Sequence, residues 1–178
     1  MTFPSFVSGE VLRAEDMNAV GMWKVGSYTV SGTVFNIDGC FTSDYDSYKI
    51  VFQGLGAAGN SAFYVKLRAG GATTANNYYS GMAYAQWSGT ILAQSRNNSS
   101  DGWYLSFTNG TNVPVGGSMD IYNPNKASVR TGFSYAGNFW DAGIAGGGYH
   151  PDTTQFNGIS LICGSSLSGT VIVYGYTK

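Results

Sequence analysis

The sequence predicts an all-β protein: an antiparallel β-sandwich, jelly-roll-like, that follows a short N-terminal arm with a small helix. Three observations predict this fold class. Apolar and polar residues alternate with period two in several stretches after Trp23, and turns rich in Gly, Asn and Ser separate these stretches. No stretch of helical periodicity of useful length follows residue 22. Roughly eight to ten short strands joined by polar turns are typical of a sandwich or barrel.

The clearest strand is FYVKLR, in which alternate residues face a core and Tyr64, Lys66 and Arg68 face the other way. WYLSF, YKIVF, SMDIY, ISLIC and TVIVYGY show similar patterns. Weaker strand candidates are KVGSYTV, TVFNI, YYSGMAYA, GTILA and SVRTGFSYA. The residues expected to face the core include Phe63, Val65, Leu67, Trp103, Leu105, Phe107, Ile121, Ile159 and Leu161.

Composition excludes several classes of partner. Charged residues make up 11% of the chain and the net charge is −1, so no basic field exists to attract nucleic acid or anionic lipid. No run of apolar residues is long enough to predict a membrane span. Cys40 and Cys163 are interpreted as two small buried hydrophobic residues, with a disulfide as the less favoured alternative. The surface must therefore be covered mainly by Ser, Thr, Asn, Gly and Tyr, which suits hydrogen bonding, stacking and protein–protein packing.

Few residues suit catalysis. The single histidine, His150, lies in the stretch GGGYHPD and is expected in a Gly-rich loop, and no GxSxG motif is present. After residue 16 every carboxylate is an Asp, which argues against a glycosidase pair. The DYD stretch at Asp44–Asp46 is interpreted as an acidic start to a strand in preference to a weak calcium site. We therefore predict no enzyme, no cofactor and no metal site.

Residues 1–22 are predicted to form a docking arm, and residues 23–178 the β-sandwich domain. Ala14, Met17 and Val20 recur on one face of a two-turn helix, and Gly21 is a natural stop. Four charged residues lie close together in the arm, where they could fix the register of docking. The alternative is that the arm packs on its own domain as a lid. The residues expected to dock are Phe3, Phe6, Val7, Val11, Leu12, Arg13, Met17 and Val20.

Three stretches resemble a family of small tailed-phage virion proteins. They are FVSGEVLRAEDMNAVGMW, GCFTSDYDSYKIVFQG and the terminal VIVYGYTK, which match an F-x-x-G-x-V-L-x-A-x-D-M-N arm motif and a β-rich body ending in Tyr-Gly-Tyr. The resemblance is weak through about residues 70–115. Arg13 stands where the family often has a Thr or Ser that would cap the helix. The chain also lacks a repetitive shaft, so it does not resemble a complete tail fibre.

The resemblance implies a non-enzymatic structural protein located in the virion. The first expectation is a receptor-binding (adhesin) subunit of a tail fibre or tail tip, docked through its arm; the alternative is a decoration or cement protein on the capsid. A small polysaccharide depolymerase is a minor alternative. The implied partners are two further copies in a homotrimer, other virion proteins, and a host-surface glycan. The candidate receptor, glycan or subunit contacts are Tyr78, Tyr79, Tyr84, Trp87 and Tyr104, whose plain alternative reading is core packing.

Overall fold

The computed structural model describes residues 21–110, 114–139 and 141–176, which form an all-β fold. The helix expected at residues 14–20 lies outside the described residues, as does the rest of the arm up to residue 20. The described residues include no helix long and apolar enough to cross a lipid bilayer. The strands are β1 (Met22–Ile37), β2 (Ser47–Ala57), β3 (Asn60–Ala69), β4 (Ala72–Thr73), β5 (Tyr78–Gln86), β6 (Ile91–Ser99), β7 (Trp103–Asn109), β8 (Val115–Tyr122), β9 (Thr131–Phe139), β10 (Ala142–His150) and β11 (Gly158–Tyr176).

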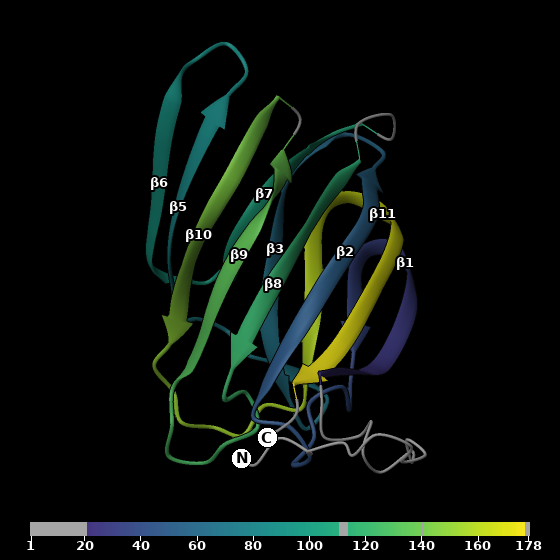
Figure 1. Ribbon diagram of the computed structural model, residues 1–178, viewed down its shortest axis with the longest axis vertical. Helices are drawn as coiled ribbons and strands as arrows, with labels where there is room; N and C mark the ends of the chain where they lie inside the picture. The colour runs from purple at the N-terminus through teal and green to yellow at the C-terminus, as the bar shows by residue number, and fades with distance from the viewer. Residues whose placement is uncertain (1–20, 111–113, 140, 177–178) are drawn as a thin grey trace, which may run out of the picture.

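The strands form one antiparallel sheet that curls into a half-barrel (Figure 1). Its order is β4-β3-β11-β2-β8-β9-β10-β5-β6, while β1 pairs with β11 and β7 pairs with β3. The long strand β11 makes this curl, because its first part, 158–163, pairs with β3 and its second part, 167–175, pairs with β2. Strand β1 follows β11 through both parts.

The all-β antiparallel prediction is confirmed, but the jelly-roll-like sandwich is not. In the structure β1 and β11 are 16 and 19 residues long, so each is shared by both halves of the curled sheet. The bend in β11 includes a register shift between Ser168 and Thr170, with Gly169 at φ +130°. Only glycine adopts that conformation readily, so the glycine at this position is what permits the bend.

The predicted core faces are mostly confirmed. The side chains expected inside from four of the strands are fully buried: Phe63, Val65, Leu67, Trp103, Leu105, Ile121, Ile159 and Leu161. Phe52 packs edge-on against Phe63 and Tyr135, with ring centroids 5.5 and 6.2 Å apart. Both cysteines are buried free thiols, as expected. Burying each large apolar side chain contributes about 1.5–3 kcal/mol, so this cluster supplies much of the driving force for folding.

The expectation for Phe107 was wrong: this residue is only half-buried, whereas Ser106 and Thr108 are buried. The cause is a β-bulge in β7, where Phe63 pairs with Ser106 but the next residue, Tyr64, pairs with Tyr104. The extra residue reverses the alternation of inward and outward side chains after the bulge. Period-two reasoning therefore holds only for the first part of this strand.

Arg68 was expected to face away from the core, yet its exposed fraction is only 6%. It makes an ion pair with Asp38 through Nε at 2.7 Å, and its Nη1 donates to Thr73 Oγ1 at 2.9 Å and Ser160 Oγ at 3.2 Å. The turn after β3 folds back to form β4, and the Gly71 carbonyl accepts a further hydrogen bond from Arg68. The guanidinium is covered because these groups surround it and satisfy its donors.

His150 was expected in a loop, but it is the last residue of β10 and is fully buried. Its ring packs edge-on against Tyr78 and Phe156, with centroids 4.8 and 5.3 Å apart. The preceding glycines were interpreted as a turn signal, whereas they allow close strand packing: a Cβ at Gly148 would overlap the carbonyl oxygen of Tyr79. The glycine run is thus a requirement of a strand interior, not of a turn.

Candidate functional site

A shallow groove runs along the outer face of the sheet over β9, β10, β5 and β6; we call it the outer groove. It consists of three adjoining hollows with volumes of about 440, 460 and 320 Å³, which share Gly81, Ala83 and Ala145 between neighbours. Ligand sites typically have volumes from about 300 Å³ upward, so the hollows reach that range. The residues of its outer surface are Tyr79, Gly81, Ala83, Ala85, Ile91, Ala93, Ser95, Asn97, Ala136, Gly143, Ala145, Gly147 and Tyr149.

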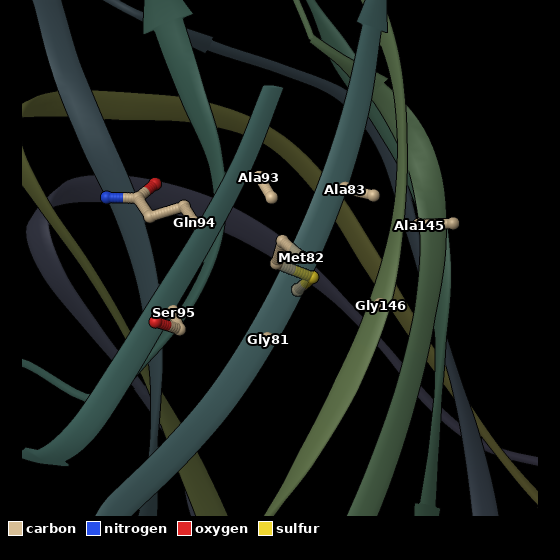
Figure 2. Close-up of a pocket in the computed structure, with 8 residues that line it drawn as sticks. All are labelled: Gly81, Met82, Ala83, Ala93, Gln94, Ser95, Ala145 and Gly146. Carbon is tan, nitrogen blue, oxygen red and sulfur yellow. The ribbon is translucent and has the colours of Figure 1, made fainter. Parts of the chain in front are cut away.

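Small residues in matching register make the floor of the outer groove. Ala145 pairs with Ala83, and Ala83 pairs with Ala93, so three methyl groups lie in a row across β10, β5 and β6. Figure 2 shows these alanines on adjacent strands, beside glycines that have no side chain. Because alternate residues face outward, a run of Gly and Ala at every second position leaves this face without bulky side chains.

Two stacked tyrosines close one end of the outer groove. The rings of Tyr79 on β5 and Tyr149 on β10 have centroids 5.0 Å apart and planes only 2° from parallel. The guanidinium of Arg130 lies 5.5 Å from the centre of the Tyr149 ring. Parallel rings held on neighbouring strands form a rigid wall, and the cation adds an attraction of about 0.5–1 kcal/mol at an exposed position.

The opposite end of the outer groove adjoins the turn between β5 and β6, where large apolar side chains are exposed. Trp87 and Ile91 are 73% and 77% exposed, and Leu92 is 41% exposed. Two hydrogen bonds to Asp141 stabilise this turn: the Trp87 amide donates to its carbonyl oxygen at 2.8 Å, and the Gln86 side chain donates to its carboxylate at 3.0 Å. An exposed tryptophan on a fixed turn is a typical contact residue.

Among the described residues that line the outer groove, one side chain is charged, and that charge is already compensated. Arg96 Nη1 makes an ion pair with Asp101 at 3.1 Å, and its Nη2 donates to the Tyr64 hydroxyl at 3.0 Å. Its guanidinium also lies 5.2 and 5.7 Å from the ring centres of Tyr64 and Tyr104. The outer groove therefore offers an electrically neutral, mainly apolar surface with polar groups from Gln94, Ser95 and Asn97 at its margin.

The structure separates the five aromatic residues that the sequence marked as contact candidates. Tyr79 lines the outer groove, Trp87 is exposed beside it, and Tyr84 is half-buried. Tyr78 is fully buried and its hydroxyl accepts a hydrogen bond from the Leu67 amide at 2.8 Å. Tyr104 is only 7% exposed, and burial raises the pKa of each of these two buried phenols to about 12. Neither buried side chain presents a face to a ligand.

Sequence reasoning missed Tyr149 and Arg130. Tyr149 lies in the Gly-rich stretch that was interpreted as a turn, and Arg130 lies in the weaker strand candidate SVRTGFSYA. Their partnership depends on the pairing of β10 with β5 and β9. The alternation of Gly and Ala in YYSGMAYA and AGIAGGGY was the available signal, because it predicts one small-residue face on each strand. The arm residues Phe3, Phe6, Val7, Val11, Leu12, Arg13, Met17 and Val20 lie outside the described residues.

The buried histidine is a structural group with one unused nitrogen. Its Nε2 donates to the Asn76 carbonyl at 3.0 Å, while Nδ1 is buried without a hydrogen bond and lies 4.0 Å from the Asp152 carboxylate. Burial lowers the pKa of His150, and the Asn76 bond and the Asp152 charge act in the opposite direction. In the described part of the chain, no three His, Cys, Asp or Glu side chains gather as a metal site would require.

Comparison with known proteins adds no relative: no family model, no curated protein and no solved structure matches this chain.

Proposed function

We propose that the chain is a non-enzymatic structural protein of a tailed-phage virion, and that it is a receptor-binding subunit of a tail fibre or tail tip. The observation that supports the adhesin role is the position of the outer groove and Trp87. Strand β1 begins beside the end of β11, at the bottom of Figure 1, whereas β5 ends at the top and across the sheet. An arm that precedes β1 and docks on the particle leaves this far end free to contact a host surface.

The docking role of the arm rests on its sequence. Its apolar residues cannot be satisfied by a two-turn helix alone, and an isolated helix so short is not stable in water. The arm motif and the Tyr-Gly-Tyr ending resemble those of virion proteins, and the neutral surface suits contacts between subunits. We propose that residues 1–22 join the subunit to another virion protein.

A head decoration protein is the second candidate, and one observation favours it. Residues 1–178 contain no shaft-like repeat, and a compact subunit placed directly on a capsid needs none. Copy number distinguishes the two. Quantitative mass spectrometry of purified particles, with immunogold labelling, should find tens of copies or fewer at the tail for an adhesin. Hundreds of copies on the head would establish decoration, and absence from the particle would contradict both.

We propose a homotrimer as the assembled form. Apolar side chains exposed on β1, Met22 at 46% and Val34 at 54%, give a neighbouring copy surface to cover. Soluble homo-oligomers usually have closed symmetry, and a three-fold trimer is one of these forms. Light scattering of the purified full-length chain at micromolar concentration should give three times the mass of 18.9 kDa. A monomer under these conditions would contradict the trimer.

A further inference from the structure

We propose that the outer groove binds an uncharged polysaccharide chain, with the chain lying along β5 between Trp87 and the Tyr79–Tyr149 wall. This inference rests on the proposed adhesin function and names the chemistry of its ligand. It follows from the shape of the outer groove, its aromatic ends and its lack of free charge.

The dimensions fit a thin linear polymer. Strand β5 has nine residues, which corresponds to a length of ~30 Å at ~3.3 Å per residue. The floor crosses β10, β5 and β6, a width of ~10 Å between the outer two strands. These proportions accommodate several sugar units in an extended chain, and the missing side chains let the chain approach the sheet closely.

A protein partner would gain little from the same surface. Sheets that pack face to face do so through large side chains that interdigitate, and stable protein interfaces bury ~800 Å² on each partner around an apolar core rich in aromatic residues. The floor here is glycine and alanine, which contribute few apolar atoms. A sugar chain needs less buried area, because its hydroxyl groups form hydrogen bonds with the polar residues at the margin.

The two ends and the margin supply the groups that a sugar needs. The indole of Trp87 is 73% exposed and can pack against the C–H face of a sugar ring. At the other end the stacked Tyr79 and Tyr149 present a fixed wall, and their phenols carry hydroxyl groups. Asn97 and Ser95 lie between on β6 and can donate or accept hydrogen bonds.

The outer groove favours an uncharged polymer, because its lining, among the described residues, offers no unpaired charge. A carboxylate or phosphate in the outer groove would lose water without gaining a cation, since Arg96 is paired with Asp101 and held by Tyr64. The guanidinium of Arg130 lies against the ring of Tyr149 at the tyrosine wall. Arg130 is not among the residues that line the three hollows.

The test uses the purified full-length chain. The probes are dextran, galactomannan and a printed array of purified uncharged bacterial surface polysaccharides, with alginate and polygalacturonate as acidic probes. We expect saturable binding to at least one uncharged probe, measured by biolayer interferometry. Trp87→Ala removes a stacking surface and Ala83→Trp fills the floor, and each should weaken that binding about tenfold.

Matched controls separate the outer groove from general effects on the surface. Trp23→Ala removes another partly exposed indole, and Ala127→Trp places the same bulky residue on an exposed loop position. Both should change the affinity by no more than about twofold. We expect all four variants to fold, because the substituted positions are at the surface or within the shallow floor. Circular dichroism and the unfolding midpoint check this for each variant.

Three results would overturn the inference: no binding to any uncharged probe, binding to acidic probes alone, or affinity unchanged in both Trp87→Ala and Ala83→Trp. None of these results would bear on whether the chain is part of a virion, which the copy number decides. Conversely, the protein could be absent from virions and still bind dextran through Trp87. That result would contradict the proposed function but support the polysaccharide site.

Discussion

Trp103 and Tyr149 connect the core to the wall of the outer groove: the indole Nε1 donates a hydrogen bond to the Tyr149 carbonyl oxygen at 3.2 Å. Trp103 is fully buried and packs against Tyr78 and Phe133, with ring centroids 5.5 and 4.5 Å apart. It therefore lies between β7 and the strands of the outer groove. The same side chain supplies apolar contact and a directed polar bond across the two halves of the curled sheet.

We expect Trp103→Phe to lower the free energy of unfolding by about 1–3 kcal/mol, because it creates a void and removes one hydrogen bond. The matched control is Trp87→Phe at an exposed position, which should change the free energy of unfolding by less than about 0.5 kcal/mol. Guanidinium unfolding followed by circular dichroism measures both. Equal effects of the two substitutions would show that Trp103 does not hold the halves together.

The glycines of β10 allow a second prediction with a close control. A Cβ at Gly148 would overlap the Tyr79 carbonyl, whereas a Cβ at Gly143 meets nothing within 4 Å. Gly148→Ala should therefore destabilise the fold by about 1–3 kcal/mol through overpacking. Gly143→Ala should have little effect or stabilise slightly, because alanine restricts the unfolded chain. Comparable thermal midpoints for the two variants would contradict the close approach of β10 to β5.

Acid should destabilise the fold through His150. Burial lowers its pKa in the folded state below the ordinary value of 6.5, so the unfolded chain binds a proton first as the pH falls. The stabilisation is present above about pH 6.5 and is lost as the pH falls below that value, with a slope of at most about 1.4 kcal/mol per pH unit. His150→Gln keeps an N–H donor but cannot titrate. Urea unfolding between pH 7 and 5.5 should show that the free energy of unfolding depends less on pH in this variant than in the unsubstituted protein. An equal dependence in both proteins would show that groups other than His150 cause the effect.

Both thiols should resist modification in the folded protein. Cys40 is fully buried and burial raises its pKa to about 12, while Cys163 is 2% exposed. A thiol must form its thiolate and meet the reagent to react. We expect no reaction with Ellman's reagent at pH 8 under native conditions, and two equivalents after unfolding in guanidinium. Rapid reaction of either thiol in the native protein would show that the sheet opens locally around it.

Removal of residues 1–20 should leave a soluble body that no longer joins the particle. Within the arm, Phe6→Ala or Leu12→Ala should weaken incorporation more than Arg13→Ala. Burying one such apolar side chain contributes ~1.5–3 kcal/mol, whereas an exposed ion pair contributes ~0–1 kcal/mol. Copies per particle, counted by mass spectrometry, measure the effect. Normal incorporation of the truncated chain would show that the arm is a lid and not an anchor.

Sequence reasoning located the strands where side chains alternate cleanly. In β3 the buried positions Phe63, Val65 and Leu67 are the apolar ones, so period two identifies the inner face. It failed where a local irregularity or a distant partner decides the outcome. The bulge in β7 is invisible in WYLSF, and nothing in the pair Tyr78–Tyr79 shows which ring faces inward.

The outer groove was beyond sequence reasoning for a related reason. Gly and Ala are weak strand formers and Gly is also common in turns, so the stretch before His150 suggested a loop. Its strand character comes from pairing with β5 and β9 on either side. Partnerships between strands distant in the chain, such as β10 with β5 and β11 with β3, determine both the groove and the curl.

The last strand has a consequence for biosynthesis. Strand β11 provides the pairing partner of β1, β2 and β3, although it follows all the other described strands in the sequence. A ribosome that has finished only the first 150 residues has released strands whose hydrogen-bonding edges are still unpaired, and such edges promote aggregation. The sheet can therefore close only after β11 has been synthesised, and a chain that ends before residue 158 cannot complete it.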